Sequence, residues 1–262
     1  MAPGKRPLAL LFDIGGVCVV SPFQAILDYE TANNIPRGWV NFSLSRHAPN
    51  GNFHRLERGE IKMDAEFFAG FTKDLQDPQL WEQFHERLRQ KNGTSGAKTP
   101  PLPKVDGEYL FWEMMGRSRA KDPYIFPALR KLKASGEFLI GALSNTVIFP
   151  EGHPYNDHER DGLTSQFDFF VSSAHVGIRK PDARVYAMAL KEMEELAAKR
   201  GLKGFKPDDI VFLDDIGENL KGARNAGMRT LKVVLGRTQD AVKELEEITG
   251  LQLLDGEEKA RL

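Results

Sequence analysis

The chain has 262 residues, enough for one large α/β domain with an insertion or for two modest domains. Its 36 Lys and Arg residues balance 37 Asp and Glu residues, so no overall charge favours a nucleic acid or an anionic membrane. We therefore expect no nucleic-acid partner, and an anionic substrate must be held by local charges.

Five short runs of the sequence are almost continuously apolar, at residues 7–12, 138–143, 167–173, 209–215 and 230–235. Continuous rather than alternating apolarity is typical of strands covered on both faces, as in a parallel sheet between helices. Residues 182–201 and 218–228 separate the later runs and have helical spacing, with Pro181 before the first helix and Gly201 after it. The order strand, helix, strand predicts an α/β fold with a doubly wound, Rossmann-like parallel sheet.

More than a hundred residues separate the first two predicted strands, too many for one crossover helix. Apolar residues recur at helical spacing in residues 22–34, 63–75, 78–91 and 107–119, whereas residues 92–107 have the composition of a loop. We expect an α/β core of residues 1–20 and 122–262, and an inserted α-helical cap of residues 21–121. Its place after the first strand would let it cover the strand ends, where open α/β sheets bind ligands.

Polar groups of four kinds lie at or after the carboxyl ends of the predicted strands, and we expect them to converge. Glycines at the first of these places permit a tight turn and close approach of the backbone to a ligand. Hydroxyl and amide groups can orient an anion, and a lysine can supply a cation. The four groups are Asp13 with Gly15 and Gly16; Ser144, Asn145 and Thr146; Lys180; and Asp214 with Asp215.

Three carboxylates in one cleft repel one another unless a cation lies among them, and oxygen ligands of this kind suit Mg²⁺. The set of Asp, Lys, Ser and Mg²⁺ is suited to phosphoryl transfer, because it provides a nucleophile, positive charge and hydrogen-bond donors. Each residue alone also has an ordinary interpretation. Asp13 could cap a turn, Ser144 could form one, Lys180 could lie on the surface, and Asp214 or Asp215 could stabilise a helix N-terminus.

In their order along the chain, these residues resemble the four motifs of the haloacid dehalogenase superfamily, whose members are mostly Mg²⁺-dependent phosphatases. The motifs are Asp13 after a strand, Ser144, Lys180 in "RKPD", and "FLDDIGENLKGARNAGM". The stretches "LERGEI", "RDGL", "FDFFVSSAHVGIRKPDARVY" and "VKELEEITGLQLL" are similar to one branch of that superfamily. This branch contains the N-terminal phosphatase domain of soluble epoxide hydrolase and the N-terminal domain of an acyl-CoA dehydrogenase family member.

The resemblance implies a phosphatase acting on a small phosphomonoester through an aspartyl-phosphate intermediate. Asp13 would be the nucleophile, and Lys180 would balance the charge of the phosphoryl group. Ser144 and Asn145 would contact that group, together with the backbone at Gly16. Oligomeric state and the identity of the substrate cannot be deduced from the sequence.

The resemblance also implies the metal ligands and a cap. Mg²⁺ would be held by Asp13, the backbone carbonyl of Gly15 and Asp215, with Asp214 as an alternative or additional ligand. The helical insert would be the family's cap.

The sequence departs from the family pattern at Gly15. Phosphatases of the family usually have a second Asp there, two residues after the nucleophile, which protonates the leaving group and later activates water. A positioned acid or base contributes roughly 10²- to 10⁴-fold to a rate. Two alternatives to an efficient phosphatase follow: a catalytically weak or inactive phosphate-binding module, and a metal-free dehalogenase. The acidic pair Asp214 and Asp215 argues against the second, because without a cation it would repel the nucleophile.

The remaining cysteine, histidine and aromatic residues are expected to have structural roles. Cys18, the only cysteine, excludes an internal disulfide and is expected to be a small buried residue. The histidines have no metal-ligand spacing, and the aromatic residues of the insert are expected to form its core; they are His47, His54, His85, His153, His158 and His175, and Trp39, Trp81, Trp112, Phe67, Phe68 and Phe71.

No stretch of the sequence has the length and apolarity of a signal peptide or of a membrane span. We therefore expect a cytoplasmic protein. The last three residues, Ala260, Arg261 and Leu262, resemble the C-terminal peroxisomal address whose prototype is S-K-L, which makes a peroxisome the alternative location.

Overall fold

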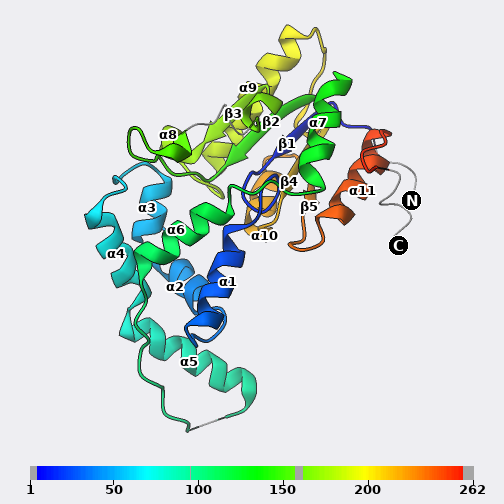
Figure 1. Cartoon of the computed structure of the whole chain (residues 1–262). Helices are drawn as coiled ribbons and strands as arrows, with labels where there is room; N and C mark the ends of the chain where they lie inside the picture. Colours follow the sequence, from blue (N-terminus) through cyan, green and yellow to red (C-terminus); the bar gives the residue numbers. More distant parts are fainter. Residues whose placement is uncertain (1–4, 95, 157–161, 256–262) are drawn as a thin grey trace.

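The structure is a computed structural model of the chain, and it describes residues 5–94, 96–156 and 162–255. Figure 1 shows a sheet flanked by helices, with a group of further helices on one side. The sheet has five parallel strands in the order β3-β2-β1-β4-β5. The five predicted strands are therefore confirmed, as β1 (Ala9–Phe12), β2 (Leu139–Ser144), β3 (Phe169–Ser172), β4 (Ile210–Asp214) and β5 (Arg229–Lys232).

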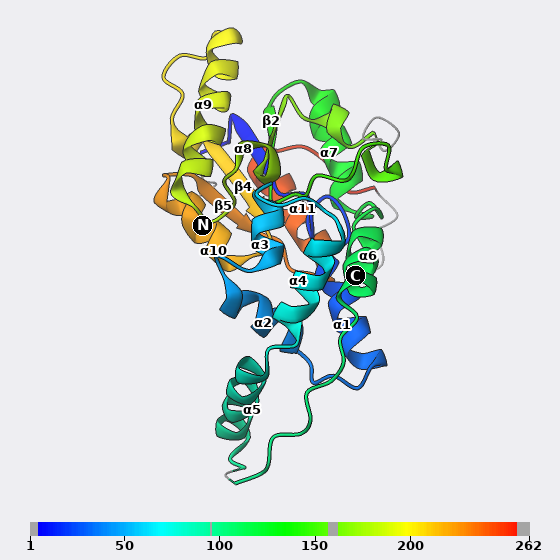
Figure 2. The same cartoon turned by 90° about the vertical axis from the view of Figure 1, so that its left-hand side faces the viewer.

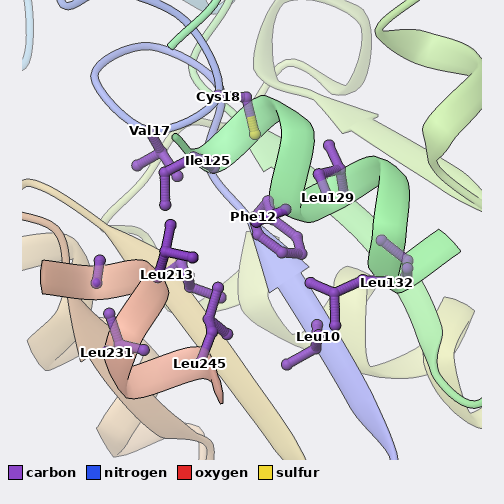
Figure 3. Close-up of a cluster of buried hydrophobic side chains, with 14 of the residues drawn as sticks. Leu10, Phe12, Val17, Cys18, Ile125, Leu129, Leu132, Leu213, Leu231 and Leu245 are labelled. Carbon is purple, nitrogen blue, oxygen red and sulfur yellow. The ribbon is translucent and has the colours of Figure 1, made fainter. Parts of the chain in front are cut away.

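Helices cover both faces of the sheet, which explains why the three central strands, β2, β1 and β4, are buried along their whole length. Leu10 and Phe12 of β1 face α7 (Ile125–Ser135) and α11 (Thr238–Thr249), as Figure 3 shows. Ala9 and Leu11, on the other face of β1, pack with α9 (Ala183–Lys199) and α10 (Gly217–Asn225). The predicted helices at 182–201 and 218–228 are α9 and α10. The doubly wound α/β fold is confirmed.

The register of the sheet brings three strand ends together. β1 lies at the centre, where Phe12 pairs with Ala142 of β2 on one side and with Leu213 of β4 on the other. The residues that follow these strands therefore emerge side by side at the carboxyl edge. This edge is where the candidate site lies.

Six consecutive helices, α1 to α6, form a segment of residues 22–117 with a largely aromatic core of its own. Trp39, Trp81, Phe67 and Phe71 are buried there, which confirms their predicted role, while Phe68 and Trp112 are partly buried against the same core. Both views show the helices gathered at one end of the core, with α5 reaching furthest from the sheet (Figures 1 and 2). They are α1 (Pro22–Ala32), α2 (Trp39–His47), α3 (Asn52–Glu57), α4 (Ala65–Leu75), α5 (Pro78–Asn92) and α6 (Gly107–Arg117).

Local sequence determines where several of these helices begin. Asp64, Asp77 and Asp106 each accept a hydrogen bond from a backbone N–H in the first turn of the following helix. This satisfies donors that have no partner inside the helix. α1, α4, α5 and α6 match the four predicted helical stretches, whereas α2 and α3 were not predicted.

The chain passes from the core to the helical segment and returns at neighbouring places. Val20 N–H donates to the Ala120 carbonyl at 2.8 Å, and Asp122 N–H donates to the Cys18 carbonyl at 3.0 Å. A second contact is made by α3, which packs on the short helix α8 (Ser173–Val176). That residues 21–121 form a separate cap domain stays a prediction.

Within the described residues, no helix is long and apolar enough to cross a membrane. The predicted peroxisomal address, Ala260, Arg261 and Leu262, lies outside the described residues, as does His158.

Candidate active site

Three carboxylates and one lysine meet at the carboxyl edge of the sheet. Asp13 follows β1, and Asp214 and Asp215 lie at the end of β4, with ligand atoms of all three within 4.8 Å of one another. The Lys180 amine lies 2.9 Å from Asp13 Oδ1 and 2.7 Å from Asp214 Oδ2. Lys180 is 1% exposed, so its charge interacts with these carboxylates and not with solvent. The structure thus brings together residues that are about 200 positions apart in the chain.

The loop after β1 shapes the backbone around Asp13. The Ile14 carbonyl accepts hydrogen bonds from the N–H groups of Val17, Cys18 and Val19, which closes a tight turn. Gly16 lies in this turn with φ of +78°, and a Cβ atom there would lie 2.6 Å from Asp215 Oδ2. Glycine is therefore required at 16, for its conformation and for space.

Gly15 differs from Gly16. Its φ is not in the left-handed region, and a Cβ atom would meet only Pro22 Cδ, at the ordinary contact distance of 3.6 Å. Neither the backbone nor a close contact therefore explains the absence of a side chain at this position.

Asp13 has two unequal carboxylate oxygens. Oδ1 accepts hydrogen bonds from the Ile14 N–H at 2.7 Å and lies against the Lys180 amine. No hydrogen bond to Oδ2 is formed by any group in the described part of the chain. Asp13 thus has one oxygen fixed in place and one that is available to a ligand.

Asp214 and Asp215 are neighbours with different environments. Asp214 is fully buried and accepts hydrogen bonds from Ile216 N–H, the Asn219 amide and Lys180. Asp215 Oδ1 is buried without a hydrogen-bond partner in the described residues. Burial, together with the charges of Asp13 and Asp214, raises the pKa of Asp215 to about 7. Burial also raises the pKa of Asp214, to about 6, although Lys180 opposes the shift.

These features fit a divalent cation. One lysine cannot balance three carboxylates, and Asp215 Oδ1 is a buried oxygen without a hydrogen-bond donor in the described residues. Among the described residues, this is the one place where three or more potential His, Cys or carboxylate ligands cluster. Oxygen atoms of this kind are the ligands that Mg²⁺ prefers.

Lys180 is held in place by Asn145. The Lys180 N–H donates to Asn145 Oδ1 at 2.8 Å, and Asn145 Nδ2 donates to the Lys180 carbonyl at 3.3 Å. Burial alone would lower the pKa of Lys180, but the charges of Asp13 and Asp214 raise it above its usual value. The lysine is therefore a permanent cation of the site.

Ser144 is buried at the end of β2, and within the described residues its hydroxyl makes only a long contact, 3.5 Å, with the Asn145 carbonyl. The hydroxyl is free to turn toward a ligand, whereas the Asn145 amide is already engaged by the lysine backbone. A contact of Asn145 with a phosphoryl group stays a prediction.

The sequence analysis missed three residues at this edge of the sheet. Asn219, which donates to both oxygens of Asp214, comes five positions later in the first turn of α10, and that spacing was a usable signal. Glu57 and Arg179 form an ion pair of 2.8 Å between the helical segment and the core. They occur in the quoted stretches "LERGEI" and "GIRKPD", but no local pattern pairs residues so far apart.

The comparisons with known proteins show the family of the chain. A family model of haloacid dehalogenase-like hydrolases matches residues 8–227, which is most of the chain. Bifunctional epoxide hydrolase 2 of Sus scrofa is 28% identical over 94% of this chain and 39% of its own length. Acyl-CoA dehydrogenase family member 10 of Mus musculus is 27% identical over 95% of this chain and 20% of its own length. The chain therefore spans well under half the length of these two relatives.

A shorter relative and a solved structure complete the comparison. A glyceraldehyde 3-phosphate phosphatase of Methanopyrus kandleri is 26% identical over 66% of this chain and 73% of its own length. The crystal structure of a dehalogenase with an intermediate complex superposes with a TM-score of 0.53 at 16% identity, covering 95% of this chain and 99% of that one. At this identity the superposition shows a shared fold.

Proposed function

The chain belongs to the haloacid dehalogenase-like hydrolases, and we propose that it is a Mg²⁺-dependent phosphatase acting on a small phosphomonoester. It is a hydrolase by family. The observation that carries the finer assignment is the arrangement at Asp13: one oxygen is fixed by Lys180 and Ile14, and the other is unengaged beside the acidic pair. The name of the Methanopyrus kandleri relative supports a phosphate ester as the substrate class.

Asp13 is the nucleophile in this proposal. Its Oδ2 attacks phosphorus and the bond from phosphorus to the ester oxygen breaks, which gives an aspartyl-phosphate. Since residue 15 is a glycine, the alkoxide that leaves takes its proton from water. Water then attacks the same phosphorus, which releases inorganic phosphate and returns the Asp13 carboxylate. Fixing Oδ1 by two donors holds the carboxylate in one orientation, which lowers the entropic cost of attack.

Lys180 and Ser144 hold the phosphoryl group. The lysine is buried beside the nucleophile and neutralises negative charge as the group is transferred. The Ser144 hydroxyl donates to a phosphoryl oxygen without adding charge. Asn145 acts on the same step by fixing the backbone of the lysine.

Asp13 and Asp215 would hold Mg²⁺ together with the Gly15 carbonyl. The cation would neutralise the phosphoryl oxygens and reduce the repulsion among the acids. Asp214 has no unengaged oxygen, so we assign it to the positioning of Lys180 and of the first turn of α10. In this proposal Asp215 binds the metal ion and the adjacent Asp214 has a positioning role.

Gly15 favours a second candidate, a weak or inactive phosphate-binding module, because no carboxylate stands where the family places its acid. The two are distinguished by Gly15→Asp, for which the structure has room. In a working phosphatase we expect this variant to raise kcat on alkyl phosphates by about 10²-fold, since an alkoxide leaves poorly without an acid. On 4-nitrophenyl phosphate, whose leaving group needs no proton, the gain should be small. Gly15→Ala, which adds a side chain without an acid, is the matched control.

The proposal as a whole is tested by measuring phosphate release from a panel of phosphomonoesters with and without Mg²⁺. We expect multiple turnovers that EDTA abolishes and that Asp13→Asn lowers by roughly 10⁴-fold or more, because the nucleophile is lost. Release that survives in Asp13→Asn or in EDTA would overturn the mechanism. Halide release from a 2-haloacid would instead support a dehalogenase.

A further inference from the structure

We propose that Glu57 and Arg179 are a positioning pair, which makes the placement of Lys180 depend on the docking of the helical segment onto the core. The inference rests on the proposed function only where catalytic rate is its readout. The pair lies outside the cluster at Asp13, and its two members come from the two parts of the molecule.

The helical segment meets the core closely at this point. A Cβ atom on Gly59 would overlap the Ala174 carbonyl oxygen of α8, so the two backbones are in contact. The Ser173 hydroxyl donates to the Glu57 carbonyl at 2.5 Å and accepts from Thr146 N–H at 2.9 Å. One hydroxyl thus joins the end of α3 to the loop that follows Ser144.

The ion pair is buried in this contact. Arg179 Nε lies 2.8 Å from Glu57 Oε2, with the side chains 23% and 9% exposed. Burial raises the pKa of Glu57, and the neighbouring Arg179 opposes that shift. A buried charge needs its partner, so either residue alone would be unfavourable here.

Arg179 is adjacent to Lys180, whose backbone is bound on both sides by the Asn145 amide. The short segment around Lys180 is therefore held from two directions. Asn145 belongs to the core and is present whatever the helical segment does. Glu57 belongs to α3, so it meets Arg179 only when the helical segment is docked on the core. The ion pair of Glu57 and Arg179 therefore couples the position of the helical segment to that of Lys180.

The chain offers a matched control three residues away, at Glu60. Glu60 pairs with Arg58 at 2.6 Å, but this pair lies within the helical segment and Glu60 is largely exposed. Glu57→Gln and Glu60→Gln remove one charge each by the same chemical change. Only the first breaks a contact with the core.

The test compares Glu57→Gln, Arg179→Gln, the double variant, Arg179→Lys and Glu60→Gln in the full chain. Amide hydrogen exchange is followed by mass spectrometry over residues 51–60 and 173–182. We expect faster exchange in both stretches in Glu57→Gln and Arg179→Gln, near wild-type exchange over residues 173–182 in Glu60→Gln, and partial recovery in Arg179→Lys. Unchanged exchange over 177–182 in Glu57→Gln would overturn the proposal.

Kinetics with 4-nitrophenyl phosphate give the second readout. We expect kcat to fall by about 10- to 100-fold in each single variant with less change in KM, because a displaced catalytic group costs rate. The double variant should be no worse than either single variant, and losses that multiply would contradict a shared role. If the wild type releases no phosphate, the proposed function fails, while the exchange measurement still decides whether the pair positions Lys180.

Discussion

Buried acids serve different purposes in the two parts of the molecule. In the helical segment, Glu30 is 1% exposed and accepts hydrogen bonds from the N–H groups of Gly38 and Val40, at the start of α2. At the edge of the sheet, Asp13, Asp214 and Asp215 face one another and a lysine. Burial of a carboxylate therefore does not locate a site by itself. The partners differ in these two cases: backbone amides bind Glu30, whereas Asp13, Asp214 and Asp215 lie together beside a lysine.

The largest expected effect comes from removing the lysine. Lys180→Met should lower the free energy of unfolding by about 3 to 5 kcal/mol, because Asp13 and Asp214 would remain buried without a cation. Urea denaturation at neutral pH measures the change. Lys191→Met, which breaks an exposed pair with Glu195, should cost less than about 1 kcal/mol. Equal losses in the two variants would mean that the buried lysine of the sheet edge contributes no more to stability than an exposed one.

A smaller effect tests the region between the two parts. Burial and the positive charges of Arg179, Arg58 and His47 lower the pKa of His54 from 6.5 to about 4. The unfolded chain therefore binds a proton more readily than the folded one. The stability that neutral His54 provides is complete above about pH 6.5 and is lost as the pH falls toward 4.

From about pH 7.5 to about pH 5, this loss should be about 2 kcal/mol in the wild type and absent in His54→Gln. Urea midpoints of the two proteins at both pH values give the difference, in which contributions from other acids cancel. His175→Gln, at an exposed position, controls for the loss of one histidine. A parallel pH dependence in wild type and His54→Gln would exclude His54 as the cause.

The smallest effect is expected for the structural acid. Glu30→Gln should lower the free energy of unfolding by only about 1 kcal/mol: the amide has one acceptor oxygen for two N–H groups, but removal of a buried charge offsets part of that loss. The rate of phosphate release should stay within about twofold of wild type. A large loss of rate would mean that the charge of Glu30 reaches the active site, which would break the comparison.

Much of the core was predictable because local rules apply there. Continuous apolar runs identified the five strands, and the parallel arrangement placed Asp13, Ser144, Lys180 and the acidic pair at one edge. The sequence did not predict which of Asp214 and Asp215 has free oxygen atoms for a metal ion. This difference depends on Asn219 and Ile216, which bind only the first of the two acids, and this is a matter of side-chain orientation.

The helical segment was less predictable. α2 begins at Trp39, directly after Gly38, and the acid that accepts from the N–H groups at its start, Glu30, comes from another helix, so no local signal marks this start. α3 is only six residues long, and its importance lies in a contact with Arg179 more than a hundred positions away. Both features are set by tertiary packing, which composition and periodicity do not encode.

The hydrogen-bonded crossings at Val20 and Asp122 have a consequence for how such a chain tolerates change. Because the two ends of the intervening hundred residues are already tied together, the core is insensitive to the length between them. Doubling a loop whose ends are held costs only about 0.6 kcal/mol of closure entropy. Insertions in the loop between α5 and α6 would then alter the outline of the molecule and leave its chemistry in place.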